Sequence, residues 1–189
     1  SEIVLTNSFA ANRPNVTASS SYSVEQVVSE SVRLTKQVLQ GTGKQTALAI
    51  GPLSAMLEPF GDLSAADCRK IFEEMISAGM QEHPDIIYIM TFMDLEMMKI
   101  AADVALQYHV PVFSSMTFSE FGATLMGNTV DDIVAALEPM GVSAIGMNCS
   151  LGPDKALPIV QQFHEKTSLP VLFKPNAGTP ILSADGGAE

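Results

Sequence analysis

Two cysteines are the strongest nucleophiles and softest metal ligands in this sequence, and they lie in different surroundings. Cys149 follows an apolar run in the stretch AIGMNCSLGP, whereas Cys68, 81 positions earlier, falls within an apolar helical pattern. A cysteine at the exit of a strand can be a packed thiol, a nucleophile paired with a base, or a thiolate ligand of zinc. Cys68 is expected to be a small buried hydrophobe, because it lies on the apolar stripe of a helix.

The three histidines do not provide a base for Cys149. His83 and His109 precede apolar runs, and His164 lies in a helical pattern. We expect them on the opposite face or the flank of the fold, where solvated or helix-terminal positions are the better interpretation. A Cys–His pair therefore cannot be assembled from this sequence. One thiolate is also only the first of the three protein ligands that a catalytic zinc takes.

Short apolar runs alternate with helical patterns along the whole chain and must position these side chains. The expected strands are 3–5, 47–50, 86–90, 110–113, 144–147 and 171–173. Helices are expected to begin at the capping residues Ser23, Ser64, Asp94, Thr129 and Asp154. Pro158 is expected in the first turn of the last helix, where proline is tolerated. This alternation predicts a parallel sheet covered by helices, which is either a barrel or an open doubly wound sheet.

The turn after the first strand favours the barrel. It reads TNSFAANRP and lacks the glycine-rich phosphate signature that an open sheet usually carries there. A complete barrel has eight units and about 250 residues, whereas this chain has 189 residues. We therefore expect residues 1–189 to form one α/β domain, an incomplete (β/α)8 barrel of the TIM type with about six βα units.

Both architectures place functional residues at the carboxyl ends of the strands. The polar residues expected there include Thr6, Asn7, Ser8, Thr91, Asp94, Thr117, Glu120, Asn148, Cys149, Lys174 and Asn176. With 21 acidic and 10 basic residues the formal charge is −11, which disfavours nucleic acid and anionic lipid as partners. No apolar run reaches the roughly 20 residues of a membrane span, and no secretion signal is recognisable, so we expect a cytoplasmic protein with reduced cysteines.

Five stretches resemble the homocysteine S-methyltransferase family, especially the homocysteine-binding domain of cobalamin-dependent methionine synthases. In chain order they are TNSFAANR, IGPLSAMLEPFGDLS, MTFSEFGATLMG, IGMNCSLGPDKALPIV and KPNAGTP. The resemblance implies a (β/α)8 barrel that transfers a methyl group to the thiolate of homocysteine. It implies that Cys149 binds zinc together with two cysteines of a later motif. The residues implied to line the substrate pocket are Thr6, Asn7, Asn148, Ser150 and Asn176.

The methyl donor in this family is methylcobalamin, betaine or S-methylmethionine, and the cobalamin-dependent branch implies methylcobalamin, with a corrinoid protein or domain as a partner. The sequence departs from the family at three places. A first strand with an Asp-Gly motif and the double-cysteine motif do not occur in it, so we expect weak or no zinc binding by this chain alone, and self-association through exposed barrel edges. Met90 replaces the glutamate that holds the amino group of homocysteine. The alternatives are a non-catalytic homologue that acts as a binding module, and a methyltransferase for a different thiol.

Overall fold

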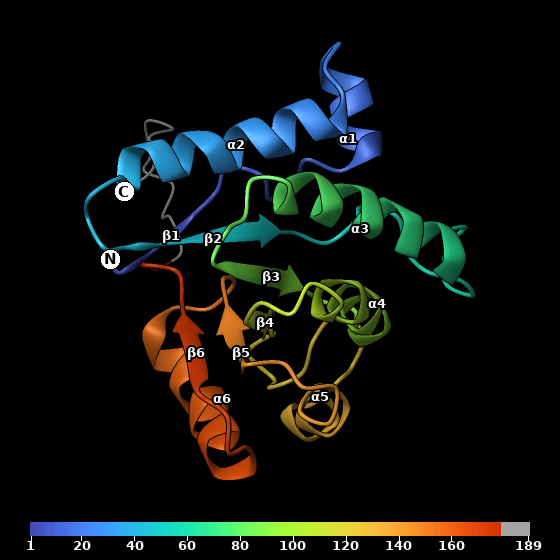
Figure 1. Cartoon of the computed structure of the whole chain (residues 1–189). Helices are drawn as coiled ribbons and strands as arrows, with labels where there is room; N and C mark the ends of the chain where they lie inside the picture. The colour runs from blue at the N-terminus through green and yellow to red at the C-terminus, as the bar shows by residue number, and fades with distance from the viewer. Residues whose placement is uncertain (179–189) are drawn as a thin grey trace, which may run out of the picture.

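Six parallel strands form one curled sheet in the computed structural model, which describes residues 1–178 (Figure 1). The strands are β1 (Ile3–Leu5), β2 (Gln45–Ile50), β3 (Ile86–Phe92), β4 (Val112–Met116), β5 (Ala144–Asn148) and β6 (Val171–Lys174). Their order in the sheet is the order in the sequence, and every neighbouring pair is parallel. The predicted parallel sheet is confirmed.

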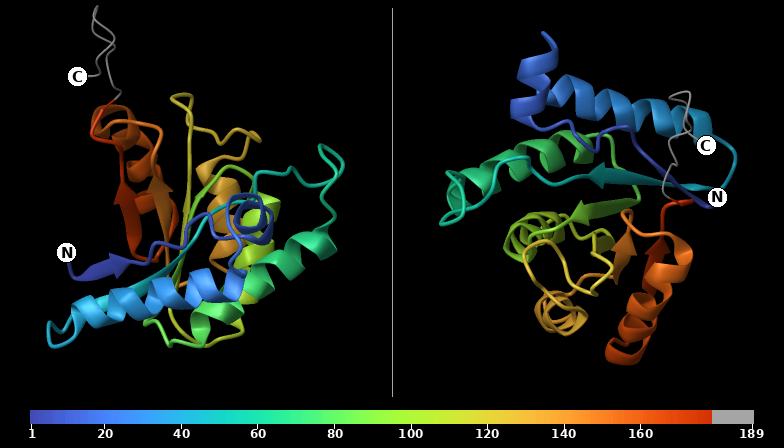
Figure 2. Two further views of the ribbon diagram at one scale, coloured as in Figure 1. Left: turned by 90° about the horizontal axis from the view of Figure 1, so that it is seen from above. Right: turned by 180° about the vertical axis from the view of Figure 1, so that it is seen from behind.

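The helices are α1 (Arg13–Ser19), α2 (Val24–Leu39), α3 (Ala65–Met80), α4 (Leu95–Leu106), α5 (Val130–Leu137) and α6 (Pro153–Lys166). Right-handed crossovers between strands in consecutive order always place the connecting helix on the same face of the sheet, whereas a doubly wound sheet needs a reversal of strand order. Helices α2 to α6 accordingly surround one side of the curled sheet (Figures 1 and 2). The barrel-type fold with six strands is confirmed.

Side-chain caps begin four helices where the sequence predicts them. Ser23, Ser64, Asp94 and Thr129 each accept a hydrogen bond from a backbone N–H in the first turn. Such caps satisfy N–H groups that have no partner inside the helix. Helix α1 was not predicted, although Asn12 caps it by accepting from Asn15 N at 3.1 Å.

The predicted start of the last helix is wrong. Helix α6 begins at Pro153 with Gly152 as its N-cap, and no side chain caps it. Asp154 lies in the first turn, where its carboxylate faces the positive end of the helix dipole. Pro158 therefore lies inside the helix and not in its first turn. It is tolerated because Asp154, whose carbonyl loses a helical partner, is exposed to water.

Two apolar clusters cover the two faces of the sheet, because successive strand residues point to opposite sides. On the outer face, strand residues such as Leu48, Ile87 and Ile145 pack against helical residues such as Phe72 and Phe163. The opposite side, called the inner face below, carries the cluster of Ala47, Ala49, Ile86, Tyr88 and Met90, with Ile3, Leu5, Phe113 and Leu172 packed against it. Within residues 1–178, no helix is long and apolar enough to cross a membrane.

The two edges of the sheet have one strand partner each among the described residues. β1 pairs with β2, and β6 pairs with β5. Helix α2 above β1 exposes 48% of Leu34 and 79% of Val38. The buried stripe of α2 runs instead through Val24, Val28 and Val32. Self-association through these surfaces stays a prediction.

Candidate functional site at the carboxyl ends of β3, β4 and β5

Asn148 is the centre of a hydrogen-bond cluster at the end of β5. It is fully buried, and its Oδ1 accepts from Thr91 N at 2.9 Å and from Ser115 Oγ at 2.5 Å. Its Nδ2 donates to Thr91 Oγ1 at 2.6 Å and to Cys149 Sγ at 3.1 Å. A backbone N–H can only donate, so the bond from Thr91 N fixes which end of the amide carries oxygen. The NH₂ group of Asn148 therefore faces the cysteine sulfur.

The backbone at this cluster is strained. Thr91, Cys149 and Ser150 have φ angles of 66°, 61° and 54°, in the left-handed region that costs non-glycine residues about 1–2 kcal/mol each. Cys149 N donates to Lys174 O at 3.0 Å, and Ser150 Oγ donates to Phe118 O. These bonds hold the conformation from β6 on one side and from the loop after β4 on the other. Such strain concentrates where a fold fixes a side chain for function.

A bulge in β3 brings Thr91 to Asn148. From Ile89 to Phe92 the strand advances three residues, while the paired positions on β4 advance two. The extra residue lets Thr91 direct both its N–H and its hydroxyl toward Asn148. Its Oγ1 also lies 3.9 Å from Cys149 Sγ, so two polar groups from different strands surround the half-buried thiol.

Below this cluster the inner face changes from polar to apolar. Ser115 on β4 is fully buried, and its Oγ lies 3.0 Å from the hydroxyl of Tyr88. Burial raises the pKa of Tyr88, so its phenol keeps its proton at neutral pH. The Tyr88 ring packs edge-on against Phe113 at 6.1 Å between centroids. Met90, two residues further along β3, is 7% exposed in the same apolar cluster.

Four of the predicted site residues lie on or after β5 and β6. Asn148 and Cys149 are in contact, and Ser150 follows them with its hydroxyl bonded to the Phe118 carbonyl. Asn176 is exposed, and its backbone N–H donates to Leu151 O at 3.0 Å. Their roles in binding substrate stay predictions.

Thr6 and Asn7 lie on the β1 side, with three strands between them and β5. Thr6 is 4% exposed, and its Oγ1 accepts from Ala49 N at 3.0 Å and lies 2.7 Å from Ser8 Oγ. The Ser8 proton goes to Ala49 O at 2.8 Å, so Thr6 donates to Ser8. The structure therefore gives the Thr6 hydroxyl a role in tying β1 to β2, and does not bring it to Cys149.

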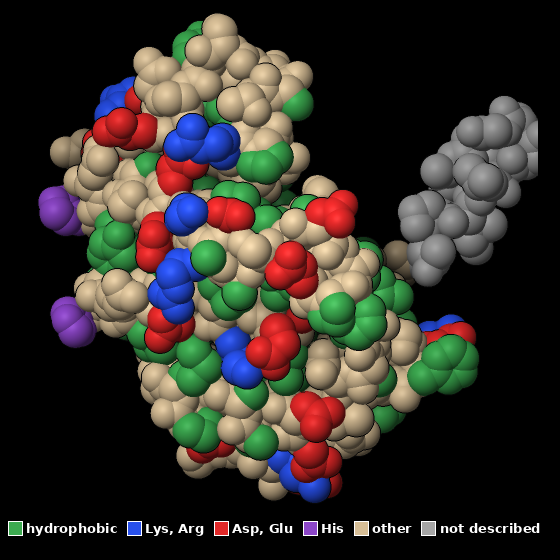
Figure 3. All heavy atoms as spheres, turned by 90° about the vertical axis from the view of Figure 1, so that its right-hand side faces the viewer, with side chains coloured by type: hydrophobic (Ala, Val, Ile, Leu, Met, Phe, Trp, Pro, Cys, Tyr) green, Lys and Arg blue, Asp and Glu red, His purple; other side chains and the backbone are tan. Residues whose placement is uncertain are grey.

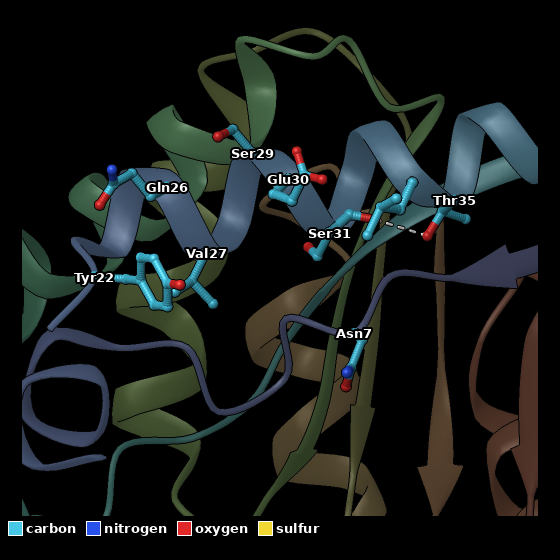
Figure 4. Close-up of a pocket in the computed structure, with 9 residues that line it drawn as sticks. Asn7, Tyr22, Gln26, Val27, Ser29, Glu30, Ser31 and Thr35 are labelled. Carbon is cyan, nitrogen blue, oxygen red and sulfur yellow. Dashed lines mark hydrogen bonds between the residues drawn. The ribbon is translucent and has the colours of Figure 1, made fainter. Parts of the chain in front are cut away.

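Asn7 lies beside two neighbouring cavities of about 690 Å³ each, one between α2 and the loop after β1, and one between that loop, α1 and the start of α2. Figure 4 shows the first of them, with Asn7 below the helix and residues of α2 above. Its lining mixes apolar, hydroxyl, amide and carboxylate side chains, namely Tyr22, Gln26, Val27, Ser29, Glu30, Ser31, Leu34 and Thr35. These cavities share no lining residue with the Asn148 cluster.

Sequence reasoning did not select Thr91, Ser115 or Tyr88 as site residues. Thr91 was recognised as a polar residue at a strand end, but its contact with the thiol depends on the bulge. The available signal for Ser115 was a hydroxyl in an apolar strand, at the alternate position that faces inward.

The histidines lie away from the cluster, as predicted. His83 and His109 follow α3 and α4 with φ angles of 50° and 55°, in the turns that lead into β3 and β4. His164 is exposed on α6. Acidic and basic side chains are interspersed among apolar ones on the face shown in Figure 3. The described residues form several exposed ion pairs, such as Arg69 with Asp103 at 2.6 Å.

The described residues do not form a complete metal site. Within residues 1–178, no three His, Cys, Asp or Glu side chains are grouped so that they could hold a metal ion. Zinc in a catalytic site takes three protein ligands, and Cys149 could supply only one of them. Alone, this donor set does not fit zinc.

Comparison with known proteins decides the family. A family model described as homocysteine S-methyltransferase matches residues 1–188. The chain belongs to the homocysteine S-methyltransferase family. Among curated members it is 31% identical over 144 residues to the methionine synthase of Mycobacterium tuberculosis, and 30% identical to that of Mycobacterium leprae. The match covers 73% of this chain but 12% of the length of either relative.

Solved structures of this family share the fold. The homocysteine methyltransferase MmuM from Escherichia coli, in its metallated form, superposes with a TM-score of 0.82 at 19% sequence identity. The superposition covers 94% of this chain and 68% of that one. Its apo form superposes with a TM-score of 0.73. The six strands described here therefore correspond to part of the barrel of a homocysteine S-methyltransferase.

Proposed function

We propose that this chain binds the thiol substrate in an S-methyltransferase that converts homocysteine to methionine. The observation that carries the proposal is the placement of Cys149, whose half-buried sulfur is held at the carboxyl ends of the strands by the amide of Asn148. In this proposal Cys149 is one ligand of a zinc ion, and the other ligands come from residues outside the described part. Zinc would keep the substrate thiol deprotonated at neutral pH.

The residues of this chain position the sulfur in the proposed site. Thr117 Oγ1 donates to Asn148 O at 3.0 Å, and Cys149 N donates to Lys174 O, so β5 is tied to both neighbouring strands beside the thiol. In the transfer, the substrate thiolate forms a bond to the methyl carbon. The bond between that carbon and the methyl donor breaks, and its electron pair stays with the donor.

Methylcobalamin is the proposed donor. Family membership and the 31% identity to a methionine synthase support this choice. A corrinoid protein or domain would then be the partner that faces the carboxyl ends of the strands, and the proposed location is the cytoplasm.

A thiol other than homocysteine is the second candidate, because of Met90. Its side chain is 7% exposed among apolar residues of the inner face. An ammonium group placed there would lose water without gaining an acceptor, since methionine offers only a weakly accepting thioether. A mercapto acid that lacks the amino group avoids this cost.

The test uses the full polypeptide that contains this sequence, loaded with zinc and supplied with methylcobalamin. Homocysteine and 3-mercaptopropionate are offered separately, and methylated products are measured by mass spectrometry. We expect methionine from homocysteine, loss of product and of bound zinc in Cys149→Ala, and neither loss in the control Cys68→Ala. Product from mercaptopropionate alone would favour the second candidate. A zinc-loaded protein that methylates neither thiol would refute both and leave a binding module.

A further inference from the structure

The hydroxyl groups behind Asn148 form a hydrogen-bond chain with a fixed direction. Ser115 Oγ lies 2.5 Å from Asn148 Oδ1 and 3.0 Å from the Tyr88 hydroxyl. A serine hydroxyl has one proton, and an amide oxygen can only accept. Ser115 therefore donates to Asn148, and Tyr88 donates to Ser115.

The direction continues to the sulfur. Because Thr91 N donates to Asn148 Oδ1, the Asn148 NH₂ group points to Thr91 Oγ1 and to Cys149 Sγ. Thr91 Oγ1 accepts one of these protons, which leaves its own proton free for the sulfur at 3.9 Å. The chain thus begins at a phenol on β3, crosses β4 and β5, and ends at the thiol.

Burial makes this chain more than a set of separate bonds. Tyr88 is 6% exposed, and Ser115 and Asn148 are fully buried. Hydrogen bonds in such surroundings polarise one another, so each donor strengthens the next. The raised pKa of Tyr88 keeps the first donor protonated across the neutral range.

We propose that Tyr88, Ser115 and Thr91 are positioning residues, which orient the amide of Asn148 so that its N–H groups hold the Cys149 sulfur in place. Tyr88 and Ser115 act on the sulfur only through Asn148, whereas Thr91 contacts both Asn148 and the sulfur itself. The expected effect of these residues on catalysis rests on the proposed methyl transfer. Their effect on the orientation of the Asn148 amide is independent of that proposal.

A matched pair of serines on β4 tests this. Ser115 and Ser114 are adjacent and buried, but Ser114 lies on the other face, and its Oγ has no hydrogen-bond partner among the described residues. The readout is the ¹H–¹⁵N signal pair of the Asn148 side-chain NH₂ group and its hydrogen exchange in the full polypeptide. We expect Ser115→Ala to shift these signals and to speed their exchange, and Ser114→Ala to leave both unchanged.

Substitutions at Tyr88 and Thr91 test the hydrogen-bond chain where Ser115→Ala fails to fold. Tyr88→Phe keeps the ring contact with Phe113 and removes only the first donor, and it should shift the same signals. Thr91→Val removes the Thr91 hydroxyl at nearly constant shape and should also shift the Asn148 signals, whereas Thr91→Ser keeps a hydroxyl and should restore the parent spectrum. In the methyl-transfer assay, loss of such a supporting group should lower kcat by roughly 10-fold or more, with KM for the donor unchanged.

The outcomes separate this inference from the proposed function. Unchanged Asn148 signals in Ser115→Ala and Tyr88→Phe, or equal changes in Ser114→Ala, would overturn the positioning role whatever the activity. The expected spectral changes in a zinc-loaded protein that methylates no thiol would support the hydrogen-bond chain and refute the methyl transfer.

Discussion

Alkylation of the two cysteines compares a thiol at the carboxyl ends of the strands, called the mouth of the sheet below, with a thiol in the apolar core. Cys68 is fully buried on α3, and burial, with the charge of Asp94 as a smaller cause, raises its pKa to about 11. At pH 7.5 about one Cys68 in 3,000 is then a thiolate, which is the reactive form. An ordinary exposed thiol with a pKa near 8.5 is about one-tenth thiolate at that pH.

The difference in thiolate population alone is about 300-fold in favour of an ordinary thiol. Burial adds to it, because iodoacetamide can reach Cys68 only after the packing around α3 opens. Cys149 is half-buried at a strand end, so the reagent needs no such opening. We therefore expect the native protein to label at Cys149 at least about 100-fold faster than at Cys68.

The assay is a time course with iodoacetamide at pH 7.5, in which mass spectrometry of peptides reports each cysteine separately. In 8 M urea both cysteines should label at similar rates, which controls for local sequence. Raising the pH toward 11 should speed the labelling of Cys68 more than the labelling of an ordinary thiol, because the thiolate population of Cys68 keeps growing up to that pH. Equal and slow labelling of both cysteines in the native protein would refute the assignment of Cys149 to an accessible mouth.

Three predictions concern stability and assembly. Ser115→Ala should lower the free energy of unfolding by about 1–3 kcal/mol in urea titrations, because it leaves Tyr88 and Asn148 without a hydrogen-bond partner. Ser114→Ala should be neutral or slightly stabilising, and equal losses in the two variants would contradict the difference in their hydrogen bonding. His83→Gly should raise the free energy of unfolding by up to about 1 kcal/mol, because the roughly 1–2 kcal/mol of left-handed strain that glycine relieves exceeds its entropy cost of about 0.5–1 kcal/mol. A lower urea midpoint would show that the imidazole stabilises the turn. Sedimentation velocity should show concentration-dependent association of this chain, reduced in Val4→Lys and Leu34→Lys on the open β1 side, and a monomer at all concentrations would count against exposed edges.

The elements that local chemistry determines were predictable. Buried parallel strands are apolar runs, and residues such as Ser23 and Thr129 cap helices through bonds within four residues of themselves. The last helix shows the limit of this reasoning. Aspartate is a frequent N-cap residue, so Asp154 was expected to cap the last helix. Proline is favoured at the first helical position, however, and α6 begins at Pro153 with Gly152 as its N-cap.

The candidate site was predictable only in part. Asn148 and Cys149 could be placed at the mouth because they follow an apolar run. The role of Thr91 could not, because it depends on one extra residue in the register between β3 and β4, and a register shift leaves no local pattern. The bond between Ser115 and Asn148 joins residues 33 positions apart, so it is a product of the tertiary fold.

The separation of the two apolar clusters bears on how members of such a family diverge. Helix-to-sheet contacts on the outer face contain the large buried side chains Phe72, Phe92 and Phe163. The inner face is lined by fewer residues, and Met90 is among them. A mutation at Met90 therefore changes the inner cluster, while the helix-to-sheet layer keeps its contacts. Divergence on one side of this sheet therefore leaves the packing of the other side in place, and its cost in stability is confined to inner-face contacts such as those of Met90 and Ser115.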